Sequence, residues 1–180
     1  MLLNKIPILD KGWVALVDSY NTTQKLRDID KEFFGSMFPP NLLDLGRMTL
    51  VMKCPLFVQL NLSKFNIRVM NTYEQVSELQ AYLPNVGEIG SRERDVCEAV
   101  ADDIARTTNA LFINAKAYRA DGVNRFISHL PTPISTYTTL LLEGSYDEWS
   151  KFCDQVNAPT PIQAYINAIK DIKDAEWKFS

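Results

Sequence analysis

The order of apolar and polar residues divides this chain into short strand-like segments and longer helix-like segments. Three short segments, residues 13–17, 48–54 and 136–142, are rich in apolar and β-branched residues over a length typical of strands. The second of them runs directly into Pro55, and proline is favoured at the first position of a helix. We therefore expect three strands, with a helix directly after the second.

Two helices are predicted in the first third of the chain. A helix over residues 23–33 places Leu26, Ile29 and Phe33 on one face, and Asn21 or Thr22 can cap it. Gly35 and the two prolines that follow end this helix. The helix after Pro55 carries the apolar positions Leu56, Phe57, Leu60 and Leu62.

Helical periodicity continues in the middle of the chain. Residues 93–120 predict a long helix with Ser91 as its cap and Gly122 just beyond its end. Its apolar stripe consists of Val96, Val100, Ile104, Leu111, Ala115 and Tyr118. A short helix is expected over residues 122–130, before two prolines.

The C-terminal third contains two capping boxes, in which a serine or threonine precedes a glutamate or glutamine by three residues. Ser145 with Glu148 opens one helix, and Thr160 with Gln163 opens the last. The buried face of the last helix is expected to consist of Ile162, Tyr165, Ile166, Ile169 and Ile172.

Strands and helices mixed within 180 residues predict a single domain, residues 1–180, of the α+β (α/β) class, with a mixed β-sheet flanked by helices. The chain has no internal repeat, low-complexity stretch or linker. Residues 85–91, which contain two glycines, are the expected break in regular structure.

Composition and charge exclude several classes of protein. The net charge is −3, so no excess of basic residues is available to hold a nucleic-acid backbone. Three cysteines without short spacing argue against a disulfide framework or a zinc site. The first residues are too weakly apolar for a signal peptide, and no run of about 18 apolar residues predicts a membrane span. We expect a cytoplasmic protein.

Candidate chemistry is sparse when residues are considered one at a time. His129 is the only histidine, and its place at a helix end beside a proline is typical of a capping or packing residue, with catalysis as the alternative. Cys54 is either a small buried residue or a nucleophile. Asp171 and Asp174 share one face of the last helix, where solvated surface carboxylates are the simpler interpretation. We assign no catalytic residue and no metal ligand.

Several segments, in their order along the chain, resemble one known family. Residues 5–18 look like its opening strand, and residues 52–58 (M-K-C-P-L-F-V) are similar to its apolar strand ending in P-I-F-V. Residues 122–125 (G-V-N-R), then Pro133, then Tyr137 with Thr138, are similar to its G-V-P-R-E-x-A-R-x-x-L-P-x-x-x-Y-T. The family is that of the flavin-dependent thymidylate synthases, and the matching segments cover most of the chain.

The residues that this family uses to bind flavin and nucleotide are largely replaced. Where the family carries R-H-R-x-x-S-x-N-E, residues 64–72 read K-F-N-I-R-V-M-N-T, which retains Asn71 and has Lys64 for one arginine. The family's nucleotide-binding arginine before L-P falls at His129. Its N-A-R, used for flavin, falls at residues 145–147 (S-Y-D), and its H-x-x-P-F-E-H at residues 41–45 lacks both histidines.

The size of this loss indicates what the resemblance implies. Arginine binds phosphate through two charge-assisted hydrogen bonds, each worth about 1.5–3 kcal/mol, and lysine cannot reproduce the pair. Losing three or more such bonds costs roughly 5 kcal/mol, or a factor of about 10³ in affinity. The resemblance therefore implies a degenerate homologue without flavin or deoxyuridine monophosphate (dUMP), acting as a non-catalytic binding or partner subunit. Because the family forms tetramers with shared sites, a second copy or an active relative is the expected partner.

The alternative is an enzyme of the same family that acts on a modified pyrimidine deoxynucleotide, with FAD bound, through a rewritten pocket. Its nucleotide-binding residues would be Lys64, Asn66, Arg68, Asn71, Arg125 and His129. The family alignment places the first four on one wall of a cleft and the last two on the other. Lys64 and Arg68 would lie on one side of either a helix or an extended segment. The remaining possibility is an unrelated α/β domain.

Overall fold

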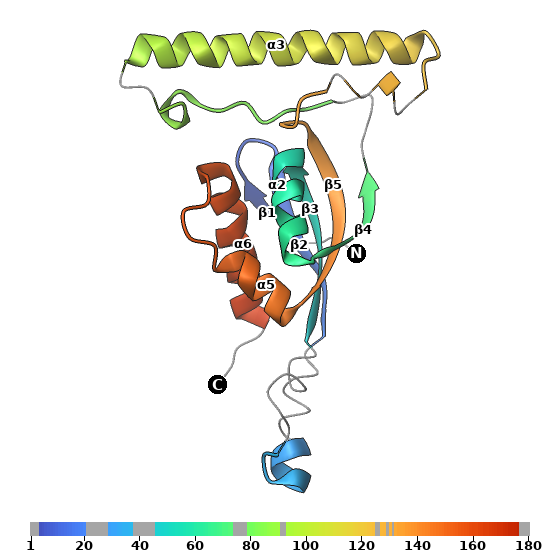
Figure 1. Ribbon diagram of the computed structural model, residues 1–180, viewed down its shortest axis with the longest axis vertical. Coiled ribbons are helices and arrows are strands. Elements are labelled where there is room, and N and C mark those ends of the chain that lie inside the picture. The colour runs from blue at the N-terminus through green and yellow to red at the C-terminus, as the bar shows by residue number, and fades with distance from the viewer. Residues whose placement is uncertain are drawn as a thin grey trace.

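The computed structural model describes residues 4–20, 29–37, 46–73, 79–90, 93–124, 127–128, 130 and 132–176. Its centre is one five-stranded sheet with the order β1-β2-β3-β5-β4, in which every pair of neighbours is antiparallel. The strands are β1 (Ile6–Ile8), β2 (Gly12–Tyr20), β3 (Arg47–Pro55), β4 (Arg68–Tyr73) and β5 (Tyr137–Ser145). The α+β fold class expected from the sequence is confirmed (Figure 1).

Three helices cover one face of this sheet: α2 (Leu56–Leu62), α5 (Tyr146–Cys153) and α6 (Thr160–Glu176) (Figure 1). The core lies between them and the sheet. Alternate residues of β3 and β5, among them Met48, Leu50, Leu140 and Leu142, are fully buried against Trp149 and the apolar face of α6. This alternation is what a strand with one covered face requires, since successive side chains point to opposite sides.

The opposite face of the sheet is less covered. Trp13, Val51 and Leu141 point to this side, and all three are half-buried. The Lys5 ammonium lies 4.2 Å from the centroid of the Trp13 ring on the same side. The sheet therefore presents an apolar centre on the face away from α2, α5 and α6.

The long helix α3 (Arg94–Ala120) lies across one end of the sheet, at the top of Figure 1. It packs against the segment of residues 79–90, which contains the short helix η5 (Val86–Glu88). The helix itself was predicted correctly, and its stripe was correct in part: Ala115 is buried and Ile104 and Leu111 are half-buried, whereas Val96, Val100 and Tyr118 are exposed. The buried residues of α3 are Cys97, Thr108, Phe112 and Ala115.

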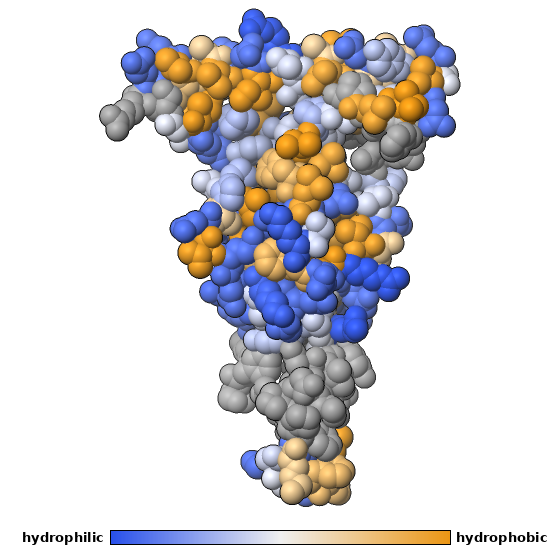
Figure 2. Space-filling view, in the orientation of Figure 1, coloured by the Kyte–Doolittle hydropathy of each residue, from blue (hydrophilic) through white to orange (hydrophobic). Residues whose placement is uncertain are grey.

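The two ends of the predicted stripe are exposed because α3 contacts its neighbours along a narrow line rather than a broad face. A helix over a sheet end can bury only the residues that meet the segment below it, and periodicity alone does not identify them. The other apolar side chains of α3 stay on the surface, where Figure 2 shows apolar patches along the helix.

The predicted first helix, residues 23–33, lies mostly outside the described residues. Its end is described as η1 (Asp30–Phe34), a short π-helical turn that Gly35 ends in a left-handed conformation. Ile29 and Phe33, expected to face the core, are 42% and 68% exposed. Figure 2 shows this apolar tip at the lower end of the molecule. The expected core contact of these two residues is therefore wrong.

The strands and helices of the second half agree well with the sequence patterns. All five residues expected on the buried face of α6 are buried, from Ile162 to Ile172. Gly122 follows α3 with φ at 77°, a conformation that favours glycine. The expected break at residues 85–91 instead contains η5, closed by a capping box between Asn85 and Glu88. Of the short helix expected over residues 122–130, Ile127 and Ser128 are described as helical.

The two capping boxes expected in the C-terminal third differ in outcome. Ser145 and Glu148 form both reciprocal bonds at the start of α5. At α6, the helix begins at Thr160 and the Gln163 backbone amide donates to the Pro159 carbonyl oxygen at 2.9 Å, so Thr160 lies inside the helix rather than at the expected capping position. The Gln163 side-chain amide donates to Asn167 Oδ1 at 2.9 Å, one turn further along the helix. The Gln163 side chain can reach Asn167 because residues four apart lie on the same side of a helix.

The segment after Pro55 contains the expected helix, α2, and then a strand, β4, that was not predicted from the sequence. Of the apolar residues of α2, Val58 and Leu62 are buried, whereas Leu60 is 59% exposed. After the short helix η3 (Ser63–Phe65), the chain turns at Asn66, where φ is 59°, and enters β4. This edge strand escaped detection because most of its side chains are exposed and its apolar pattern is weak.

Candidate functional site

Four of the six residues expected to bind a nucleotide lie on η3, on β4 and at the turn between them. Lys64 is exposed on η3, whose Phe65 ring packs edge-on against Phe152 of α5 at 5.7 Å between centroids. Asn66 occupies the left-handed turn that follows. Because the backbone changes from helix to strand at this turn, the spacing between Lys64 and Arg68 does not have the regular geometry from which a shared side was expected.

Arg68 and Asn71 lie on β4, opposite Glu143 and Leu141 of β5. A bulge between Val69 and Asn71 inserts one extra residue, which brings both polar side chains to the sheet face away from α5 and α6. The Asn71 side-chain oxygen accepts a hydrogen bond from the Thr72 amide at 2.8 Å. Arg68 and Asn71 are thus brought together on one face of an exposed edge strand.

Glu143 changes the electrostatics of this face. Its carboxylate lies 3.9 Å from the Arg47 guanidinium and directly opposite Arg68 in the strand register. A half-buried carboxylate next to the available cations opposes the binding of a phosphate there. Arg125 and His129, expected on the opposite wall, lie outside the described residues.

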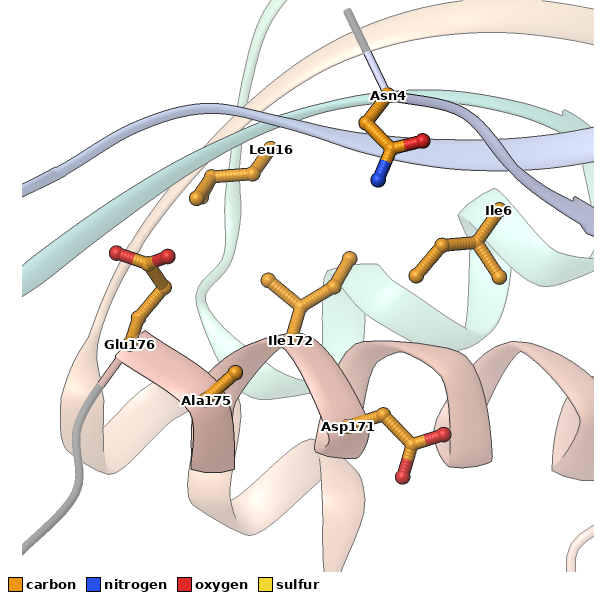
Figure 3. Close-up of a pocket in the computed structure, with 7 residues that line it drawn as sticks. All are labelled: Asn4, Ile6, Leu16, Asp171, Ile172, Ala175 and Glu176. Carbon is orange, nitrogen blue, oxygen red and sulfur yellow. The ribbon is translucent and has the colours of Figure 1, made fainter.

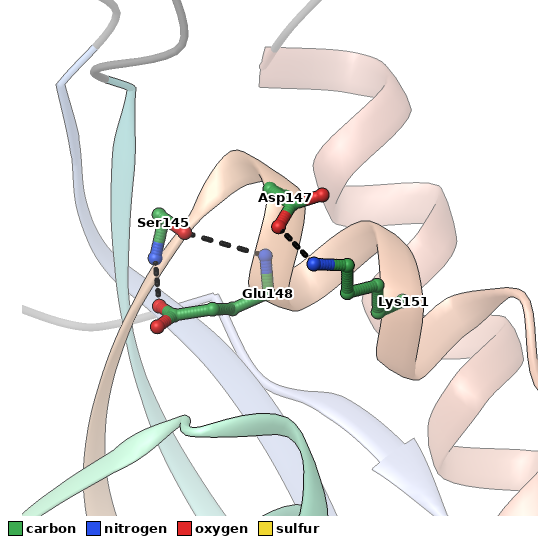
Figure 4. A network of polar contacts seen from close by, with 4 residues as sticks. All are labelled: Ser145, Asp147, Glu148 and Lys151. Carbon is green, nitrogen blue, oxygen red and sulfur yellow. Dashed lines mark hydrogen bonds and ion pairs between the residues drawn. The ribbon is translucent and has the colours of Figure 1, made fainter. Parts of the chain in front are cut away.

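The start of α5 occupies the position where the family resemblance places a flavin-binding N-A-R. Here Ser145 Oγ accepts a hydrogen bond from the Glu148 amide at 3.3 Å, and Glu148 Oε2 accepts one from the Ser145 amide at 2.7 Å (Figure 4). Asp147, in the same first turn, forms an ion pair with Lys151. The free amides of this helix start are therefore partly satisfied within the chain, and two carboxylates surround it.

The cysteines in the core have the properties of packing residues. Burial raises the pKa of the Cys54 thiol well above its ordinary value, and the side chain is fully buried. Burial also raises the pKa of Cys153 to about 11. A thiol is nucleophilic as its thiolate, so neither cysteine is activated. This supports the interpretation of Cys54 as a small buried residue.

A polar cluster beneath α3 was not predicted from the sequence. Tyr137 donates a hydrogen bond to Asp10 Oδ1 at 2.8 Å, and Tyr165 donates one to the Lys53 carbonyl oxygen at 2.8 Å. The Lys53 ammonium donates to Gln80 Oε1 at 2.5 Å and lies 5.7 Å from the centroid of the Tyr137 ring. These contacts join the turn between β1 and β2 to the ends of β3 and β5 and to residue 80.

The tyrosines of this cluster are hydrogen-bond donors at neutral pH. Burial is the largest cause of the raised pKa of Tyr137, followed by its bond to Asp10. Burial likewise raises the pKa of Tyr82, whose hydroxyl donates to Glu88 Oε2 at 2.6 Å. The sequence feature that could have indicated this cluster is Lys53, a charged residue within an otherwise apolar strand segment.

A shallow pocket of about 280 Å³ adjoins the cluster, between α3 and residues 79–83. Its polar residues are Lys11, Gln80, Thr108 and Asn109, and Phe112 is among its apolar ones. Within the described part of the chain, no three histidine, cysteine or acidic residues are grouped to hold a metal ion. No described helix is long and apolar enough to cross a membrane.

Comparison with known proteins identifies a structural neighbour. No family model and no curated protein sequence matches the chain. Among solved structures, the fold is similar to that of the UMP/dUMP methylase PolB from Streptomyces cacaoi bound with 5-Br dUMP. The TM-score is 0.68 over 94% of this chain and 93% of that chain, at 16% sequence identity. The fold is therefore thymidylate-synthase-like.

Proposed function

We propose that this chain is a divergent relative of the flavin-dependent thymidylate synthases that acts as a non-catalytic binding subunit. The observation that carries the proposal is the start of α5. A fold similar along nearly its whole length to a dUMP methylase has, at the position of the family's flavin-binding motif, a closed capping box and the carboxylates of Asp147 and Glu148.

The physical argument concerns the charge that a helix start can accept. An unoccupied helix N-terminus attracts a phosphate through its free amides and partial positive charge. At α5, the charge of Glu148 already occupies this position, and its carboxylate bonds the Ser145 amide at 2.7 Å. The pyrophosphate of a flavin would have to break this hydrogen bond and approach a second carboxylate, that of Asp147. Binding of the pyrophosphate at this helix start is therefore unfavourable.

The exposed polar residues of β4 also argue against a phosphate site. Arg68 and Asn71 are exposed rather than enclosed, and Glu143 lies opposite Arg68. The Glu143 carboxylate lies 3.9 Å from the Arg47 guanidinium and opposite Arg68 in the strand register, so it offsets one of these two positive charges and weakens the attraction of this face for a phosphate.

A role in assembly is supported by the surface of the molecule. Large apolar side chains are exposed on more than one described element. Four of them lie along α3: Val96, Val100, Ile113 and Tyr118. We infer that α3 and the open sheet face bind another subunit, either a second copy or an active relative.

The first experiment is the absorption spectrum of the purified protein, followed by denaturation in the presence of added FAD. The proposal expects no flavin absorbance and no stabilisation by FAD. As a matched control, Asp147→Asn with Glu148→Gln removes both carboxylates without changing side-chain size. Flavin released in stoichiometric amount from the native protein contradicts the proposal.

The second candidate function is an enzyme on a pyrimidine deoxynucleotide, favoured by the exposed donors Lys64, Arg68 and Asn71 near one strand edge. It is tested by calorimetric titration with deoxyuridine, deoxycytidine and thymidine monophosphates. Binding that weakens by about 2 kcal/mol in the Lys64→Ala, Arg68→Ala double variant supports this candidate. The absence of heat at millimolar nucleotide supports the non-catalytic subunit.

A further inference from the structure

The shallow pocket of about 280 Å³ beneath α3 lies at the end of the sheet that this helix crosses (Figure 1). One of its sides is a single face of α3, formed by residues at helical spacing: Ala105, Thr108, Asn109 and Phe112. The other side consists of residues 79–81 and 83 and of Lys11, in the turn between β1 and β2. The pocket is thus a slot between a helix face and the segment that the helix covers.

Thr108 is the residue of this slot that points to a ligand. It is 8% exposed, and it lines the pocket. Within the described part of the chain, its hydroxyl group has no hydrogen-bond partner. A buried polar group without a partner is unfavourable, so the slot favours a molecule that bonds this hydroxyl from inside.

The hollow between the β1–β2 edge of the sheet and the end of α6 lacks such a residue. Its volume is about 400 Å³, and its polar residues, Asn4, Asp171 and Glu176, are all exposed (Figure 3). Water already solvates exposed side chains, so they gain little from a ligand. The slot beneath α3 is therefore the better candidate for a binding site.

The charge around the slot favours an anion with a single negative charge. Among the described residues that line it, Lys11 is the only charged one. A second ammonium group, that of Lys53, donates to Gln80 Oε1 at 2.5 Å, and Gln80 lines the slot. The Asp10 carboxylate lies 3.5 Å from the Lys11 ammonium and also accepts a hydrogen bond from the Tyr137 hydroxyl. Two ammonium groups and one carboxylate leave a net attraction for a monoanion.

Gln80 and Lys11 together suit a carboxylate. Because Gln80 Oε1 accepts the bond from Lys53, the NH₂ group of the same amide points away from Lys53 as a donor. An NH₂ group and an ammonium group both donate, and the two oxygens of a carboxylate both accept. A phosphate suits the slot less well, since its second negative charge would lie near Asp10.

The remaining walls select a flat apolar body. Phe112 is buried, and Ala81 and Ala105 leave room because their side chains end at Cβ. The volume lies near the lower limit of small-molecule pockets, about 300 Å³, which suits a single ring packed against the Phe112 ring. We propose that the slot binds a small aromatic monocarboxylate with a ring hydroxyl, held by Lys11 and Gln80 at the carboxylate and by Thr108 at the hydroxyl. This site does not depend on the proposed function.

The test is calorimetric titration of the full chain with 3-hydroxybenzoate and 4-hydroxybenzoate. We expect saturable binding of one molecule of at least one isomer, weakened roughly threefold or more by Lys11→Gln and abolished by Ala105→Leu, which fills the slot. Thr108→Val replaces the hydroxyl by a methyl group, so it should weaken the hydroxybenzoate roughly threefold or more and leave benzoate unchanged. The control is Lys116→Gln, which removes an equal charge from the exposed surface of α3 outside the slot. The neutral hydroxybenzamide should bind more weakly than the acid.

Three outcomes would overturn the inference. The first is the absence of saturable heat with both isomers at concentrations up to tens of millimolar. The second is a Lys116→Gln variant that weakens binding as much as Lys11→Gln, or a hydroxybenzamide that binds as well as the acid, since either would show that Lys11 does not hold the carboxylate. The third is a Thr108→Val variant that weakens benzoate as much as the hydroxybenzoate, which would show that the Thr108 hydroxyl does not bond the ligand.

Discussion

Replacing Gly12 by alanine tests how tightly the polar cluster beneath α3 is packed. A Cβ atom at Gly12 would lie 2.0 Å from the Tyr165 hydroxyl oxygen, 2.8 Å from the Ile8 carbonyl oxygen and 3.0 Å from the Lys53 carbonyl oxygen. Tyr165 is fully buried, and the same hydroxyl donates to the Lys53 carbonyl. The added methyl group must therefore displace the tyrosine or move the turn between β1 and β2.

Both terms of the cost follow from these contacts. Forcing an extra carbon into a packed site costs about 1–3 kcal/mol. Breaking the Tyr165 hydrogen bond without offering a new partner adds about 1–3 kcal/mol. We expect Gly12→Ala to lower the free energy of unfolding by roughly 2–5 kcal/mol, a large fraction of the stability of an ordinary domain.

A second substitution separates this mechanism from a general effect on the strand. Tyr165→Phe removes the clashing oxygen and should by itself cost about 1 kcal/mol. In the double variant we expect at least 1 kcal/mol less destabilisation than the sum of the single variants. Recovery stays partial because the two carbonyl oxygens remain near the new methyl group.

The assay is urea unfolding followed by far-ultraviolet circular dichroism. The slope of the unfolding free energy against urea concentration must be the same for all variants for their free energies to be compared. Additive free energies would refute the reasoning, because they would mean that the Gly12 methyl group does not meet the tyrosine hydroxyl. A Gly12→Ala variant as stable as the parent would refute it more directly.

Three further predictions concern the helix start, the core and the assembly. Ser145→Ala should lower the free energy of unfolding by about 1 kcal/mol, because it removes one half of the capping box, and a loss below a few tenths in thermal melts would contradict the bond. Stability should fall as the pH rises above about 9, because the folded state keeps Cys153 protonated up to about 11 while the unfolded state loses that proton near 9.0. When each protein is compared with its own stability at pH 7, Cys153→Ala should lose less stability over this pH range than the parent chain. Light scattering should give a mass above 20.5 kDa at micromolar concentration, and Val100→Lys with Ile113→Lys on α3 should lower it, whereas a monomeric parent chain contradicts the assembly role.

The sequence by itself was sufficient for elements whose pattern and environment agree. The stripe of α6 was predicted residue by residue because that helix lies flat against a sheet, so that one whole face is buried. The strands β2, β3 and β5 were located, with shorter bounds, because their apolar runs are central in the sheet. The capping box of α5 was predicted because its bonds are local and need no tertiary contact.

Tertiary structure decided the features in which distant segments meet. Val96 and Val100 of α3 are exposed although their spacing is typical of a buried face, because the segment below the helix is too narrow to cover them. The edge strand β4 exists because β5 offers it a free row of backbone groups, and its own side chains carry little signal.

The same distinction applies to the sites. Arg68 and Asn71 were named as candidates from the resemblance to a family, but the carboxylate of Glu143 beside them comes from a strand about 70 residues away. Asp171 and Asp174 were interpreted as solvated surface carboxylates of the last helix, and both are exposed in the structure. A sequence specifies which groups a chain carries and its local periodicity. The charges that meet, and the hollows they enclose, are set by the packing of elements that are far apart in the chain.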